Sequence, residues 1–379
     1  MKLRTMLVVL AAAVLATGCA NTDDPGAQRE KLLSRHPEEA VIGVAWPFAT
    51  RNDGFKEGLE LALEEINQVG VMGHPLRLVL EDDQSSVTEG LAIAQAFANR
   101  SDMAAVIGHR SSAVTVPASK VYENAGLLLL APSSTSPSLT EGGAEHVFRL
   151  IPNDAQLGRV MADYAKAQGY RNIVVYYAND EYGRGLANSF EDSAKSNRLQ
   201  IIDRLSDFKD GAELKRLVSK WKLLDCDAVF IAQTMPDGAD FIVQLREAGL
   251  DVPVMGGDGM DSPDLLEIAG NDADNAVVAS VFNPEGAGEL VESFVDKYTD
   301  KYGEAPRKYS AQAYDSLHIL AEAASLANSW KPADIAAVLR AQSSWPGVSG
   351  LRSFDADGEV QQMSIVLKRV ANGAFEYMR

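Results

Sequence analysis

The chain has 379 residues, of which 46% are hydrophobic and 23% are charged, so it can bury enough core for two domains. Its formal net charge of −18 would repel a polyanion, which argues against nucleic acid as a partner. The acidic residues are spread along the chain rather than run together, which is typical of a solvated surface.

The first nineteen residues have the three parts of a secretory signal: Lys2 and Arg4, then an apolar stretch, then small residues up to Cys19. The apolar stretch is too short for a stable membrane span. The segment LATGC resembles the lipobox of bacterial lipoproteins, in which the cysteine becomes the lipidated first residue after cleavage. We therefore predict a signal peptide at residues 1–18, a lipid anchor on Cys19, and a location in the periplasm or at the cell surface.

Residues 19–39 are polar after the cysteine and lack a sustained apolar period, so they predict a flexible tether between anchor and fold. Cys226 is the second of two cysteines in the sequence, so we expect no internal disulfide once Cys19 is lipidated. Cys226 opens the apolar run DCDAVFIA, and we interpret it as a buried structural thiol. The histidines are scattered and no cysteine pair is present, so the sequence predicts no metal and no cofactor.

From residue 40 onward, short apolar runs alternate with helical patterns, which predicts parallel strands with helices on both faces of a sheet. The pattern runs once to about residue 131 and restarts at residue 171, so we expect two similar doubly wound lobes. A tail with helices and two late strands could complete either lobe. The expected strands are 41–46, 76–83, 104–108, 127–131, 171–178, 199–205, 227–232, 252–257, 351–354 and 363–370, and the tail helices are 286–302, 308–328 and 332–341.

Hydroxyl groups follow two neighbouring strands of the first series. VIGHRSS places Ser111 and Ser112 directly after a strand, and LLLLAPSSTS places Ser133 and Thr135 after the next. Ligands of doubly wound sheets bind outside the carboxyl ends of the strands, where helix N-termini point their free amides. This grouping favours a carboxylate or phosphate site. The alternative is that the serines only cap helices.

The second series offers groups that suit a cation. Tyr182 lies in the strand-end loop NDEYGRG, and Asp258 lies in VPVMGGDGMD, which lacks the lysine of a phosphate loop. Taken alone, Asp258 could be a turn residue. Together, an anion site on one lobe and a cation site on the other favour a zwitterion, such as an α-amino acid, bound between the lobes.

Four stretches carry a family resemblance: VIGHRSSAVTVPASKVYENAG, LLLLAPSSTSPSLT, NDEYGRGLANSFED and VPVMGGDGMDSPDLLEIAG. They resemble the leucine/isoleucine/valine-binding branch of the type I periplasmic binding proteins of ABC transporters, from about residue 40 to the C-terminus. The resemblance implies two Rossmann-like lobes joined by three crossovers near residues 152–156, 280–284 and 347–352. The implied lobes are 40–153 plus 284–349 and 154–283 plus 350–379.

The resemblance also implies roles for individual residues. The ligand carboxylate would be held by Ser112, Ser133 and Thr135, and the amino group by Asp258 and Tyr182. In the relatives, glutamate stands at the position of Asp258 and an aromatic residue at that of Gln233 and Thr234, so leucine does not follow as the ligand. The implied side-chain pocket contains Trp46, Phe48, Arg110, Gln233 and Thr234. Arg110 could meet an acidic ligand side chain or could face solvent.

We therefore expect an extracytoplasmic lipoprotein, a monomer that performs no chemistry. It would bind an amino acid, branched-chain or otherwise neutral, and deliver it to the permease and ATPase subunits of an ABC importer. One alternative is an amino-acid or amide sensor that acts through a separate partner. A hydrolase would need His109 to activate Ser111 or Ser112, which adjacent residues on a turn seldom achieve. A sugar-binding relative would not require the cation site.

Overall fold

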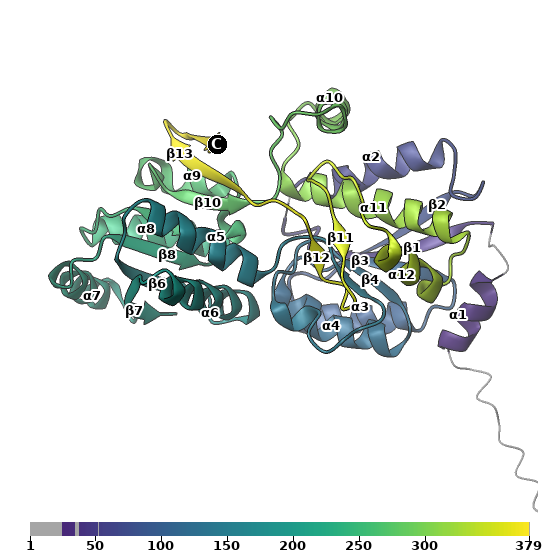
Figure 1. Ribbon diagram of the computed structural model, residues 1–379, viewed down its shortest axis with the longest axis horizontal. Coiled ribbons are helices and arrows are strands. Elements are labelled where there is room, and N and C mark those ends of the chain that lie inside the picture. The colour runs from purple at the N-terminus through teal and green to yellow at the C-terminus, as the bar shows by residue number, and fades with distance from the viewer. Residues whose placement is uncertain (1–24, 35–37, 52, 379) are drawn as a thin grey trace, which may run out of the picture.

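The computed structural model describes residues 25–34, 38–51 and 53–378. They form two α/β lobes, the first on the right and the second on the left of Figure 1. The predicted α/β class with two doubly wound lobes is confirmed. The predicted signal peptide and Cys19 lie outside the described residues. Within the described ranges, no helix has both the length and the apolarity needed to cross a membrane.

The first lobe is built on a sheet of five parallel strands. In spatial order these are β2 (Leu76–Asp82), β1 (Ala40–Trp46), β3 (Met103–Gly108), β4 (Leu128–Ala131) and β5 (Val147–Arg149). Strands β1, β3 and β4 are buried along their whole length, as expected of parallel strands covered on both faces. The strand order reverses between β1 and β3, so a ligand crevice is expected at their carboxyl ends.

Helices cover both faces of the first sheet. They are α2 (Phe55–Asn67), α3 (Val87–Ala98), α4 (Ser112–Asn124), α10 (Glu289–Tyr302), α11 (Lys308–Ala327) and α12 (Pro332–Ala341). α2 and α11 share one core with Ile42 and Val44, while α3 and α4 contribute Phe97 and Tyr122 to a core on the other face. The tail helices therefore belong to the first lobe, although they follow the second lobe in sequence.

The second lobe repeats the strand order of the first. Its sheet runs β7 (Gln200–Leu205), β6 (Asn172–Tyr177), β8 (Ala228–Ala232), β9 (Val254–Gly256) and β10 (Val277–Ser280), then β13 (Val366–Ala371) and β14 (Ala374–Tyr377). The first five strands are parallel, and β13 and β14 extend the sheet in antiparallel fashion. Here the order reverses between β6 and β8, which gives the second lobe its own crevice.

The helices of the second lobe also form two layers. They are α5 (Asp154–Ala167), α6 (Glu181–Ser196), α7 (Gly211–Leu223), α8 (Asp237–Glu247) and α9 (Asp264–Ala269). α5 and α6 share one core, while α7 and α8 share the other. Asn153 caps α5, because its Oδ1 accepts from the amide of Gln156 at 3.0 Å. Asp180 caps α6, accepting from the amide of Gly183 at 2.8 Å.

The chain passes between the lobes after β5, after β10 and before β13 (Figure 1). The predicted third crossing near residue 350 needs correction, because β11 (Ser353–Phe354) and β12 (Val360–Gln361) pack in the first lobe. Arg352 explains this: it is fully buried, donates to the carbonyl of Leu150 at 3.0 Å, and pairs with Asp315 of α11 at 2.8 Å. The other lobe boundaries stay a prediction.

The predicted flexible tether is also partly wrong, because residues Pro25–Leu33 form helix α1, which docks on the first lobe. Arg29 is buried and donates to the carbonyls of Ala98 at 2.8 Å and Ala125 at 2.6 Å, at the ends of α3 and α4. Such carbonyls lack partners within their own helices. Leu33 joins the first core. Arg29 and Leu33 alone do not make an apolar face that repeats at helical spacing. The sequence therefore gave no signal that this segment docks on the first lobe.

Candidate ligand-binding site between the lobes

A cavity of about 190 Å³ lies between the two lobes. Its walls come from the carboxyl ends of strands in both sheets, where the two crevices face each other, and from the start of α11. Of the predicted residues, the cavity brings together six. From the first lobe these are Arg110, Ser112 and Ser133, and from the second lobe Tyr182, Thr234 and Asp258.

Ser112 is the first residue of α4 and is buried at the helix N-terminus. Its Oγ accepts from the hydroxyl of Ser134 at 3.1 Å and from the amide of Ser136 at 3.4 Å. The two hydroxyl-rich loops are therefore joined. Ser111 occupies the capping position but makes no side-chain cap hydrogen bond, so its hydroxyl does not serve the helix. The arrangement leaves hydroxyls and helix amides for a negatively charged group.

A buried arginine that the sequence analysis missed fixes the loop after β4. Arg149 is fully buried and donates to the carbonyls of Ser134 at 2.6 Å and Ser136 at 2.7 Å. Its Nε also donates to both carboxylate oxygens of Glu359, at 3.1 and 3.0 Å. The two carbonyls turn toward Arg149, which fixes the conformation of the loop carrying Ser133. Because Arg149 ends a strand within an apolar run, its sequence gave no functional signal.

On the second lobe, Asp258 and Tyr182 form a hydrogen-bonded pair. Asp258 opens the short 3-10 helix η2 (Asp258–Met260), and its Oδ1 accepts from the Tyr182 hydroxyl at 3.1 Å. The hydroxyl in turn accepts from the amide of Gly259 at 2.9 Å. Burial raises the pKa of Tyr182 well above its usual value, so the phenol stays protonated. The phenol is therefore neutral, and the carboxylate of Asp258, 4% exposed, is the group of the pair that can accept hydrogen bonds from a cation.

Lys308 already lies beside Asp258. It is buried, its Nζ donates to the backbone carbonyl of Asp258, and it lies 3.9 Å from Oδ2. Burial acts to lower the pKa of Lys308, but Tyr309 and Asp258 outweigh it, so the ammonium stays charged. This contact links α11 of the first lobe to η2 of the second. Lys308 begins a long helix and looks like a surface lysine in sequence, so it was missed.

Thr135 is buried but does not line the cavity, so the prediction that it holds the ligand is not supported by its position. Its carbonyl accepts from the amide of Asp154 at 2.9 Å. Neither its hydroxyl nor the carboxylate of Asp154 has a hydrogen-bond partner among the described residues. Burial raises the pKa of Asp154 to about 8. Asp154 was also missed by the sequence analysis.

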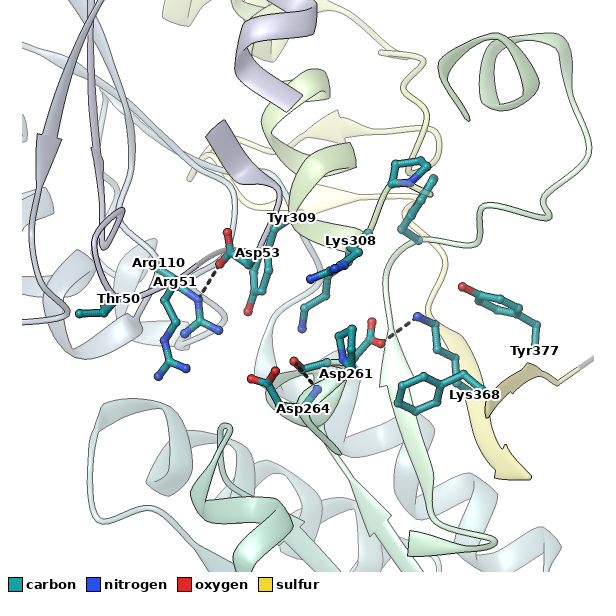
Figure 2. Close-up of a pocket in the computed structure, with 16 residues that line it drawn as sticks. Thr50, Arg51, Asp53, Arg110, Asp261, Asp264, Lys308, Tyr309, Lys368 and Tyr377 are labelled. Atoms are coloured by element: carbon teal, nitrogen blue, oxygen red, sulfur yellow. Dashed lines mark hydrogen bonds and ion pairs between the residues drawn. The ribbon is translucent and has the colours of Figure 1, made fainter. Parts of the chain in front are cut away.

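A second space of about 390 Å³ lies beside the cavity (Figure 2). The two spaces share Arg51, Arg110 and Tyr309, which therefore lie on the boundary between them. Arg110 does not face solvent: its side chain is 11% exposed, its Nε lies 3.2 Å from an oxygen of Asp53, and its guanidinium lies 4.9 Å from the centre of the Tyr309 ring.

Three residues predicted for the side-chain pocket do not line either space. Trp46 is fully buried, stacks on Phe55 with ring centroids 3.6 Å apart, and donates to Asp53 at 3.3 Å. Trp46 therefore holds the carboxylate of Asp53 in position without itself lining the cavity. Phe48 packs on the first core, and the side-chain oxygen of Gln233 accepts from the amide of Thr234 at 3.0 Å. Local spacing placed these residues at strand ends but could not show where each side chain points.

His109 points away from the serines. Its Nδ1 lies 2.7 Å from Asp83, and its Nε2 lies 3.1 Å from the hydroxyl of Tyr122. All three side chains are buried. With both ring nitrogens occupied, His109 is not placed to activate Ser111 or Ser112. Among the described residues, no group of three acidic, histidine or cysteine side chains could hold a metal ion.

Comparison with known proteins decides the family. Residues 45–374 match the periplasmic binding protein family. The chain belongs to the type I periplasmic binding proteins of the leucine/isoleucine/valine-binding family. The Leu/Ile/Val-binding protein homolog 1 of Brucella abortus is 30% identical, over 89% of this chain and 92% of its own length. This confirms the resemblance seen in the four motifs.

Solved structures agree. An ABC transporter substrate-binding protein from Desulfitobacterium hafniense, in complex with Leu, is 42% identical over 90% of this chain and 100% of its own, with a TM-score of 0.83. LivJ of Streptococcus pneumoniae, in complex with isoleucine, is 27% identical over 89% and 98%, with a TM-score of 0.80. These relatives are binding proteins of transporters and not enzymes, which confirms that this periplasmic binding protein is not an enzyme.

Proposed function

We propose that this protein captures an α-amino acid between its lobes and delivers it to the permease of an ABC importer. The observation that carries the proposal is the pairing of opposite sites across one cavity. Ser112, at the N-terminus of α4, and Ser133 line it from the first lobe, and Asp258 with Tyr182 line it from the second lobe. A zwitterion satisfies both sites at once, and its contacts with each lobe stabilise the closed form.

The contacts between the lobes support a closed arrangement around the cavity. Ser136 donates to Glu181 at 2.7 Å, and Arg51 donates to the carbonyl of Met235 at 3.2 Å. Each bond joins a first-lobe loop to a second-lobe element. A ligand that adds hydrogen bonds to both lobes would shift the population further toward this form.

The deciding experiment is calorimetric titration of the full-length protein, solubilised in detergent, with the common amino acids and with their amine-lacking analogues. Leu and Ile, which two solved relatives bind, are the first neutral ligands to test. The panel also includes acidic amino acids, because Arg51 and Arg110 line the neighbouring space. We expect removal of the amine to weaken binding at least about tenfold. Equal affinity for an amino acid and its amine-lacking analogue would refute the amino-acid assignment.

We also propose that Cys19 carries a lipid that holds the protein at a membrane facing the periplasm or the cell surface. The support is the LATGC segment alone. Mass spectrometry of the protein isolated from its host should show a diacylglyceryl-cysteine N-terminus, and Cys19→Ser should release the protein from membranes. Ligand uptake that depends on the protein in intact cells would separate import from the sensing alternative.

A further inference from the structure

We infer that the ligand is an α-amino acid whose side chain carries a carboxylate, and that Arg51 and Arg110 select it. The inference rests on the proposed function, because it takes the α-carboxylate and α-ammonium sites as given. It concerns the far end of the ligand. At that end, the side chains of Leu and Ile, which two relatives bind, consist only of hydrocarbon.

The position of the two arginines is the first reason. Ser112 and Asp258 border the 190 Å³ cavity, whereas Arg51, Arg110 and Tyr309 border both this cavity and the 390 Å³ space beyond it. The two arginines therefore lie at the boundary that a ligand side chain reaches when it extends from the head-group site toward the larger space. Figure 2 shows both arginines on the same wall of that space.

The donors of Arg110 are the second reason. Its guanidinium has five N–H donors, and its hydrogen bond to Asp53 uses the one on Nε. Asp53 and the Tyr309 ring hold the group in place, with Trp46 donating to Asp53 from behind. The terminal nitrogens make no other side-chain hydrogen bond within the described part of the chain. A fixed guanidinium fork with unused donors matches a carboxylate, which accepts two parallel hydrogen bonds.

Arg51 is the third reason. It donates to the carbonyl of Met235 at 3.2 Å, and its Nε is buried without a hydrogen-bond partner among the described residues. No described carboxylate lies within ion-pair distance of it. A hydrocarbon side chain beside this cation would remove its water and supply no counter-charge, which is costly. A ligand carboxylate supplies that counter-charge.

Most of the acids that line the two spaces are already matched by cations. Asp53 pairs with Arg110, Asp261 with Lys368, and Asp258 with Lys308. Asp180, which also lines the smaller cavity, accepts from the amide of Gly183 as the cap of α6. Asp264, which forms no ion pair with another described residue, lies across the larger space from the arginines (Figure 2).

The test compares glutamate with glutamine, and aspartate with asparagine, by titration of the full-length protein at one ionic strength. These pairs differ in charge and hardly in size. We expect an acidic amino acid to bind at least about tenfold more tightly than its amide and than leucine. Arg51→Gln and Arg110→Gln should each cut this preference at least about fivefold. Arg77→Gln, at the far end of strand β2, should leave it unchanged.

Because Arg110→Gln leaves Asp53 buried without its partner, the double variant Asp53→Asn with Arg110→Gln keeps the test valid if the single variant fails to fold. Tighter binding of leucine or isoleucine than of glutamate and aspartate would overturn the inference while leaving the proposed function intact. Binding of glutarate or succinate as tight as that of the amino acids would instead overturn the amino-acid function itself. Retention of the full acidic preference in both arginine variants would overturn the selecting role.

Discussion

The carboxylate of Asp258 is the group whose removal most directly tests the amino-group site. It is 4% exposed and accepts from Tyr182 at 3.1 Å, with the ammonium of Lys308 3.9 Å from its other oxygen. A hydrogen bond to a charged group contributes about 1.5–3 kcal/mol. Because Lys308 and Tyr182 already share the charge of Asp258, we expect the lower half of this range for a ligand ammonium.

We therefore predict that Asp258→Asn weakens amino-acid binding by about 1.5–2 kcal/mol, or roughly 10- to 30-fold, at unchanged size. Calorimetric titration of the best-binding amino acid measures this loss. The affinity for the amine-lacking analogue should hardly change, so the two ligands and two proteins form a cycle that isolates the ammonium contact. Asp251→Asn removes a carboxylate whose side chain is 96% exposed and serves as the matched control.

Thermal unfolding must accompany these titrations, since Lys308 loses part of its counter-charge in Asp258→Asn. If the variant folds and binds every amino acid as tightly as the wild type does, Asp258 does not hold the amino group. The reasoning from opposite sites on two lobes would then be refuted, because the remaining contacts of the second lobe do not require a cation.

Three further predictions concern stability and reactivity. Burial raises the pKa of Asp154 to about 8, so the folded state holds a proton that the unfolded chain releases near pH 4. The unfolding free energy should therefore fall as the pH rises from about 4 to 8. Asp154→Asn should lose this part of the decline, and parallel pH profiles of the two proteins would contradict the prediction. Arg149→Met should lower the urea unfolding free energy by about 3–5 kcal/mol, because two carbonyls and Glu359 lose a buried partner; a loss below about 1 kcal/mol would argue against that role. Cys226 is only half-buried, but this burial raises its pKa to about 11. Iodoacetamide at pH 7.5 should therefore alkylate it far more slowly than a free thiol, and rapid labelling would contradict the raised pKa.

The fold could be predicted because its signals are local. Each buried strand, such as β3 or β4, is a short apolar run, and each helix shows its own period. The repeat of this alternation predicted two similar lobes. Strand ends of parallel sheets gather at one edge, which is why Ser112, Tyr182 and Asp258 were found as candidates from their places in the chain.

Some features were missed because they depend on distant parts of the chain. Helix α1 docks through Arg29, which reaches carbonyls at the ends of two later helices. Segment 353–363 stays with the first lobe because Arg352 pairs with Asp315 in α11. Neither contact has a period or a motif, since one buried charged residue looks like any surface charge in sequence.

The sequence by itself determined the α/β class, the two lobes and the edge at which a ligand would bind. It did so because hydrophobic periodicity and turn chemistry act over a few residues. Only the tertiary structure decided which charges meet in the cleft: Lys308 beside Asp258, Arg110 on Asp53, and Arg51 without an acid among the described residues. Lys308 reaches Asp258 across the interface between the lobes, and Arg110 reaches Asp53 from another loop of the first lobe, so both contacts depend on how distant parts of the chain pack together.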